Sequence, residues 1–130
     1  YFQRKGIPQT PADLVAHNCL DYTRSGEPGR WRFTGPEGEI AVPVNGPLHV
    51  DDDEALSQAV LGGLGVGLLP TFIIGKDLQN GNLQAVLSEY IPVELHVYAM
   101  YLPTRHLPSK VRVFIDFMIS HIGEEPYWDR

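Results

Sequence analysis

The sequence has little cysteine and little positive charge. Cys19 is the one cysteine among 130 residues, which excludes a disulfide within the chain and suits a reducing compartment. Ten lysines and arginines stand against sixteen aspartates and glutamates, so the net charge is −6 at pH 7. Arg4 and Lys5 form the longest basic run. Because phosphate binding needs clustered cations, this chain alone is a poor candidate for binding nucleic acid.

Long apolar runs are also missing. No stretch approaches the roughly 20 residues that span a bilayer, and the first residues lack the apolar core of a signal peptide. We therefore expect a cytoplasmic protein with no membrane partner. The chain has no initiator methionine and opens with what looks like the end of a helix, closed by Gly6, so we expect it to be part of something longer. A protease-site scar ending in Tyr-Phe-Gln is a competing interpretation of residues 1–3.

The motifs of nucleophilic and zinc chemistry are not visible. The sequence has no Gly-x-Ser-x-Gly elbow, no His-Glu-x-x-His pair and no Cys-x-x-Cys pair. Only His49 and Asp51 have a suggestive spacing, and one such pair is weak evidence for a metal, so a surface or cleft-edge histidine is the favoured interpretation. We predict a protein that is not an enzyme and that takes no metal or cofactor. The histidines are scattered: His17, His49, His96, His106 and His121.

Residues 46–70 are the most informative segment. They predict a short strand, an acidic helix start, an amphipathic helix, a glycine turn and a buried strand. A phosphate-binding glycine loop must lie between a strand and the following helix, whereas these glycines follow a helix and precede a strand. We therefore interpret them as a sharp helix-to-strand turn that needs residues tolerating positive φ. The glycines are Gly62, Gly63, Gly65 and Gly67.

The other elements follow from local patterns. Thr10 and Pro11 predict a helix start, and Asp51 is the expected cap of the middle helix, with Glu54 completing a capping box. A strand is expected over 18–22, a hairpin over 31–33 and 40–42, short strands over 48–50 and 66–69, helices over 72–78 and 109–123, and a strand over 95–102. Strands alternating with helices predict an α/β fold with a mixed, mainly parallel sheet.

Three segments in this order and spacing carry a family resemblance: the opening residues 1–14, the helix, turn and strand of 51–70, and residues 108–117. Together they resemble the C-terminal part of the effector-binding domain of LysR-type bacterial transcriptional regulators. The resemblance covers nearly the whole chain except the tail, 124–130. The sequence Tyr101-Leu102-Pro103 departs slightly from the commoner Tyr-Pro ending of that strand.

The resemblance implies a domain organisation. Two α/β lobes of the periplasmic-binding-protein type (type II) are joined by crossing strands, and a small effector binds in the cleft between them. Residues 1–92 would form the second lobe, and 93–130 would supply a returning strand and the C-terminal helix of the first lobe. The DNA-binding winged helix-turn-helix and the start of the first lobe are not in this chain, so promoter DNA would be bound only through a segment outside it. The returning helix would be left partly uncovered, which predicts a homo-oligomer or a swapped arrangement.

The candidate effector-binding residues are strand-end positions, because ligands of open α/β sheets bind at the carboxyl ends of strands. Three lie at the middle helix start, Asp51, Asp52 and Asp53, and the other strand-end candidates are Thr34, Gly35, Pro70 and Thr71. The alternative is that the three aspartates only cap the helix and complement its dipole. Three carboxylates oppose an anion, so a neutral, hydroxylated or cationic effector is favoured.

These observations predict a small-molecule sensor of a transcriptional regulator. A solute-binding lobe of a transport protein shares the same architecture and is the alternative from a different class. An enzyme on this fold is disfavoured, since no catalytic constellation is visible.

Overall fold

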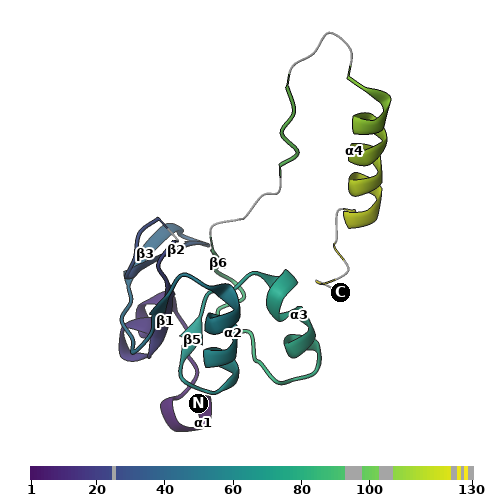
Figure 1. Cartoon of the computed structure of the whole chain (residues 1–130). Helices are drawn as coiled ribbons and strands as arrows, with labels where there is room; N and C mark the ends of the chain where they lie inside the picture. Colours follow the sequence, from purple (N-terminus) through teal and green to yellow (C-terminus); the bar gives the residue numbers. More distant parts are fainter. Residues whose placement is uncertain (25, 93–97, 103–106, 124–125, 127, 129–130) are drawn as a thin grey trace. The chain divides into compact units, whose positions relative to one another are not determined.

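The computed structural model describes residues 1–24, 26–92, 98–102, 107–123, 126 and 128. The chain divides into two compact units, Tyr1–Glu94 and Leu95–Arg130 (Figure 1). In chain order the elements are α1 (Phe2–Lys5), the 3-10 helix η1 (Pro11–Ala16), β1 (Cys19–Tyr22), β2 (Arg30–Gly35), β3 (Gly38–Pro43), β4 (His49–Val50), α2 (Asp53–Leu61), β5 (Val66–Gly67), α3 (Thr71–Gln79), β6 (Ile91–Pro92) and α4 (Ser109–Ile122).

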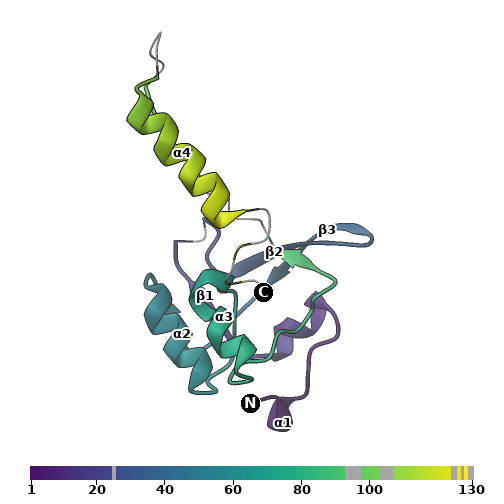
Figure 2. The same ribbon diagram turned by 90° about the vertical axis from the view of Figure 1, so that its right-hand side faces the viewer.

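A parallel sheet of three strands, in the order β4-β1-β5, organises the first unit. Its central strand is covered on both faces, because the consecutive residues Cys19, Leu20 and Asp21 are all buried. Helix α2 packs against β1 and buries Leu56 completely. In Figure 2, α3 lies beside α2, and the two helices also contact each other. The α/β class expected from the sequence is confirmed.

The second sheet is antiparallel, in the order β3-β2-β6. Its central strand alternates as the sequence predicts, with Trp31 and Phe33 buried and Arg32 and Thr34 exposed. Strands β2 and β3 form the predicted hairpin, in the register Trp31↔Val42. The hairpin therefore belongs to a sheet of its own rather than extending the parallel sheet. The main buried apolar cluster draws on η1, β1 and this hairpin: Leu14, Cys19, Trp31, Phe33, Val42 and Val44.

The glycines of the helix-to-strand turn serve two different purposes. Gly63 alone among the four has a positive φ, +72°, so the expectation of a left-handed backbone is wrong for the others. Gly65 is needed for close approach, because a Cβ there would lie 2.1 Å from the carbonyl oxygen of Asn18. A Cβ on Gly67 would meet the Val60 side chain at 2.9 Å. On the other side of β1, a Cβ on Gly46 would lie 2.1 Å from the carbonyl oxygen of Cys19.

The cap of α2 is one residue later than predicted. Asp52, not Asp51, has the extended backbone of an N-cap, and its Oδ1 accepts a 2.7 Å hydrogen bond from the backbone N–H of Ala55. The helix start at Thr10 and Pro11 is as predicted, although η1 is a 3-10 helix. Asp13 accepts backbone hydrogen bonds from Thr10 and Gln9, and these bonds hold the pKa of its carboxyl below the ordinary 3.8.

The second unit contains α4, which begins and ends within one residue of the predicted helix. Of the strand expected over 95–102, residues 95–97 lie outside the described residues, and 98–102 have no strand pairing. Within the described part of this unit, large apolar side chains are exposed, including Met100 at 94% and Phe114 at 59%. An amphipathic helix with an uncovered apolar face is expected to pack against further protein.

Candidate functional site

The three strands of the parallel sheet end at one edge. Thr23 follows β1, Asp51 follows β4, and β5 leads to Pro70 and the start of α3. The backbone N–H of Thr23 donates to the carbonyl of Val50 at 2.8 Å, which holds the ends of β1 and β4 together. We call this set of residues the carboxyl edge: Thr23, Arg24, Asp51, Asp52, Asp53, Pro70 and Thr71.

The acidic part of the carboxyl edge is the start of α2. Asp52 caps the helix, because its side chain accepts the backbone N–H of Ala55. For this residue the alternative interpretation, a capping role, is therefore correct. Asp51 is exposed and Asp53, the first residue of the helix, is half-buried. Among the described residues, neither forms an ion pair. Asp51 and Asp53 therefore remain available to a ligand.

A second helix begins at the same edge. Pro70 is the N-cap of α3, and its carbonyl accepts hydrogen bonds from the backbone N–H groups of Ile73 at 3.0 Å and Ile74 at 3.4 Å. Thr71 is the first residue of α3 and is exposed. Helix N-termini carry a partial positive charge from their aligned peptide dipoles. The carboxyl edge thus combines two helix starts with acidic side chains.

Thr34 and Gly35 lie elsewhere. They end β2 in the antiparallel sheet, where Thr34 pairs with Ile91 of β6. A Cβ on Gly35 would lie 2.7 Å from the ring of Tyr90, so the residue allows the chain before β6 to pack closely. Thr34 and Gly35 therefore belong to the antiparallel sheet, and not to the parallel sheet whose strand ends form the carboxyl edge.

A buried carboxylate supports the strands that lead to the carboxyl edge. Asp21 on β1 is 1% exposed, and its Oδ2 accepts the backbone N–H of Gly29 at 2.7 Å. Its Oδ1 accepts the indole N–H of Trp31 at 3.0 Å. Nδ1 of His49, on β4, lies 3.7 Å from Oδ2. Asp21 therefore links β1 to the hairpin and to β4, and His49 is a neighbour of this carboxylate.

Sequence reasoning missed Thr23 and Arg24. Both are exposed and directly follow β1, the central strand of the parallel sheet. The rule that ligands bind at strand ends could have found them, because the strand over 18–22 was predicted correctly. Arg24 also introduces a cation at an edge that looked purely acidic from residues 51–53.

Other kinds of site find little support in the described part of the chain. Within it, no three His, Cys, Asp or Glu side chains gather closely enough to bind a metal ion. Among the same residues, no helix combines the length and apolar character needed to cross a membrane. Two surface hollows are lined by other residues than the carboxyl edge, one beside α1 and one between residues 7–9 and 84–90.

Comparison with known proteins identifies the family. The family model described as the LysR substrate binding domain matches residues 1–123. The chain belongs to this LysR family. It is part of the effector-binding domain of a LysR-type transcriptional regulator and not an enzyme. The resemblance inferred from the sequence is confirmed, and the relatives are regulators rather than transport proteins.

The relatives of this LysR domain are considerably longer. The HTH-type transcriptional regulator PtxR of Pseudomonas aeruginosa is 31% identical over 94% of this chain and 40% of its own length. An uncharacterized HTH-type transcriptional regulator of Escherichia coli, YcaN, is 34% identical over 91% of this chain and 38% of its own length. The chain thus spans about 40% of the curated relatives that it matches.

Solved structures of LysR-type regulators share the fold. The Vibrio cholerae virulence activator AphB superposes with a TM-score of 0.72 at 25% identity, covering 92% of this chain and 41% of AphB. CrgA of Neisseria meningitidis gives a TM-score of 0.65 at 24% identity, covering 95% of this chain and 42% of CrgA. At this level of identity the likeness concerns the fold alone.

Proposed function

We propose that the carboxyl edge is this chain's contribution to an effector site in a cleft between two lobes. One observation carries the proposal: the ends of β1, β4 and β5 meet at one edge, and α2 and α3 both begin there. The connection from β4 through α2 to β5 crosses from one side of β1 to the other. In open α/β sheets such a crossing leaves a crevice at the carboxyl ends of the strands, where ligands bind.

We propose that residues 1–92 form the second lobe and that 93–130 belong to the first. The exposed apolar side chains of α4 and of residues 98–102 support this division, as does the chain's span of about 40% of its relatives. In the isolated chain, a second copy or a swapped arrangement covers these side chains. Light scattering with hydrogen exchange tests this expectation. A monodisperse monomer whose Phe114 and Met118 are well protected contradicts it.

The charges of the carboxyl edge favour a particular ligand class. Asp51 and Asp53 make no ion pair among the described residues, and a carboxylate ligand placed beside them would be repelled. A neutral, hydroxylated or cationic effector meets no such repulsion and can accept or donate hydrogen bonds there. Arg24 is the one cation of the edge, and it allows an effector that also carries an acceptor group at the end of β1.

In the full-length cytoplasmic regulator, effector binding would favour one relative orientation of the lobes. In an oligomer, that preference would change the spacing of the DNA-binding segments outside this chain and hence transcription. A ligand achieves this only through its different affinities for the two orientations.

The test begins with the full-length regulator and a thermal-shift screen of metabolites. A ligand at a hundred times its dissociation constant adds about 2.7 kcal/mol to the free energy of unfolding. For a hit, Asp51→Asn and Thr71→Val should weaken binding, whereas Glu37→Gln, in the hairpin turn, is a matched control that removes an exposed carboxylate elsewhere. Equal affinities in all three variants would refute the site. Equal affinity of wild type and Asp52→Asn for a dicarboxylate would refute the charge argument, since asparagine still caps the helix.

A further inference from the structure

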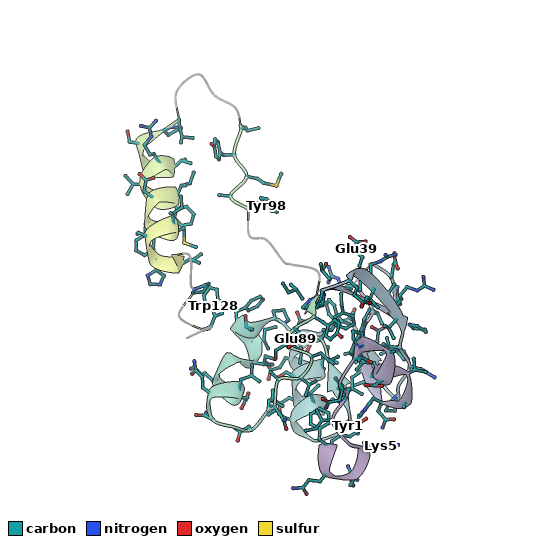
Figure 3. All side chains as sticks on the ribbon, turned by 180° about the vertical axis from the view of Figure 1, so that it is seen from behind. Tyr1, Lys5, Glu39, Glu89, Tyr98 and Trp128 are labelled. Atoms are coloured by element: carbon teal, nitrogen blue, oxygen red, sulfur yellow. The ribbon has the colours of Figure 1, made fainter. Side chains whose placement is uncertain are left out.

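We propose a second ligand site at the opposite edge of the parallel sheet, one that binds a small organic carboxylate with an apolar body. A surface pocket of about 270 Å³ lies there, and we call it the amino-edge pocket. Figure 3 shows Tyr1 and Lys5 together at α1, at this end of the first unit. The lining residues come from α1, from the chain before β1 and from the turn after α2: Tyr1, Arg4, Lys5, Asn18, Gly63 and Leu64.

The walls of the pocket are held by hydrogen bonds within the protein. The Tyr1 hydroxyl accepts the backbone N–H of Asn18 at 2.9 Å and is hydrogen-bonded to Nδ1 of the buried His17 at 3.1 Å. The Asn18 side-chain amide donates to the carbonyl of Leu64 at 3.3 Å, which joins the chain before β1 to the turn after α2. The positions of the Tyr1 ring and of the turn after α2 are therefore set before a ligand arrives, which lowers the entropy cost of binding.

The charge of the pocket favours an anion. In a chain of net charge −6, Arg4 and Lys5 lie side by side in sequence, and neither has a carboxylate partner among the described residues. The backbone N–H groups of Gly63 and Leu64 are already used, since they donate to the carbonyls of Val60 and Ala59. Recognition of an anion therefore falls to charged groups rather than to these backbone N–H groups, and the Arg4 guanidinium can bind both oxygens of a carboxylate.

The rest of the lining is apolar or open. The Tyr1 ring and Leu64, which is 45% exposed, offer apolar surface. Gly63 has φ +72° and nothing within 4 Å of the position where a Cβ would stand, so the pocket is open above this residue. The volume of about 270 Å³ lies just below the usual range of pockets for drug-sized ligands, so only a small ligand fits. A compact ring or short chain bearing one carboxylate satisfies both the apolar surface and the cations.

This site differs from the carboxyl edge in place and in charge. Helix α2 begins at Asp53 beside the carboxyl edge and ends at Leu61, two residues before Gly63 of the amino-edge pocket. The two sites therefore contact opposite ends of one helix, and the amino-edge pocket has cations where the carboxyl edge has mainly carboxylates. The proposal does not depend on the carboxyl edge being the effector site.

The experiment is a titration of the 130-residue chain with phenylacetate, followed by NMR, with the neutral phenylacetamide as the matched ligand. Phenylacetate should shift the backbone amide signals of Asn18, Gly63 and Leu64, and phenylacetamide should bind far more weakly. Replacing Arg4 and Lys5 together by alanine should weaken phenylacetate binding by about tenfold, because two exposed charge contacts are lost.

Lys110→Ala with Arg112→Ala on α4 is the matched control, because it removes the same charge outside the pocket. This control should bind phenylacetate like the wild type. Three results would overturn the proposal: equal binding of the acid and the amide, equal weakening by the two double variants, or signal shifts confined to other residues. Each of these concerns the amino-edge pocket and leaves the carboxyl edge untested, so the two proposals fail separately.

Discussion

The indole N–H of Trp31 donates a 3.0 Å hydrogen bond to the carboxylate of Asp21, which is 1% exposed. Trp31 belongs to the antiparallel sheet and Asp21 to the parallel sheet. The bond thus joins the two sheets through a buried carboxylate group. Burying a carboxylate is costly unless it is hydrogen-bonded, so the loss of a donor leaves a large part of that cost uncompensated.

Trp31→Phe should therefore destabilise the first unit by more than the loss of packing. A double-mutant cycle with Asp21→Ala, which removes the acceptor, separates the two effects, and urea unfolding should give a coupling energy of about 1.5 kcal/mol or more. Additive effects of the two substitutions would mean that the hydrogen bond contributes nothing of its own.

The cap of α2 can be tested by comparing neighbouring aspartates. Asp52→Ala removes the acceptor of the Ala55 N–H and should lower the free energy of unfolding by about 0.5–2 kcal/mol. Asp51→Ala changes the same charge one residue earlier, outside the cap, and should cost no more than about 0.5 kcal/mol. Denaturant titrations of both variants provide the measurement. A larger loss in Asp51→Ala would restore Asp51 as the cap.

Gly65 and Gly63 should respond differently to alanine. A Cβ on Gly65 would stand 2.1 Å from a backbone oxygen, so the chain must move, and we expect a loss of about 3 kcal/mol or more. Gly63 has open space, and alanine there has only the strain of φ +72°, about 1 kcal/mol. Thermal or urea unfolding distinguishes the two. Losses of similar size would show that close approach does not limit this turn.

Cys19 should be an unreactive thiol, and its burial should make the folded chain less stable at alkaline pH. Burial, and secondarily the Asp21 carboxylate, raises the pKa of this thiol from 9.0 to about 11. The folded chain therefore holds the proton more tightly than the unfolded chain. Its contribution to stability is complete below pH 9 and is lost as the pH rises from about 9 toward 11.

Two measurements check this prediction. Iodoacetamide at about pH 8 should alkylate Cys19 much faster in urea than in the folded chain, because the thiolate is the reactive form. Between about pH 9 and 11, the urea midpoint of the wild type should fall more steeply than that of Cys19→Ala, in which the other titrating groups are unchanged. Parallel curves, or equal alkylation rates, would contradict a buried thiol.

Local sequence patterns predicted most of the helices and strands. The features that these patterns did not predict depend on tertiary contacts. The alternation around Trp31 and Phe33 needs only its own strand and turn, so the hairpin was predictable. The assignment of that hairpin to a separate sheet depends on pairing with β6, at Ile91, far along the chain. The sequence could not distinguish Asp52 from Asp51 as the cap of α2. The two side chains have the same chemistry, and only the backbone conformation makes Asp52 the cap.

The candidate site was predictable in part for a related reason. Asp51, Asp53, Pro70 and Thr71 follow strands or begin helices, which sequence patterns show. Thr34 and Gly35 also end a strand, but they belong to the sheet that does not form the carboxyl edge. The hydrogen-bond donors to Asp21 come from Gly29 and Trp31, and no spacing rule connects a strand carboxylate to a later indole.

The narrow space around β1 affects how this domain should be compared with its relatives. Gly46 and Gly65 flank the strand from opposite sides, and each allows a backbone approach that no side chain permits. Both positions should therefore reject substitution as strongly as a filled core position, although neither residue has a side chain. In an alignment, an invariant glycine at 46 or 65 would indicate close packing of the backbone against β1 rather than contact with a ligand. Residues that vary with the effector should instead be sought at 23, 24, 51, 53 and 71.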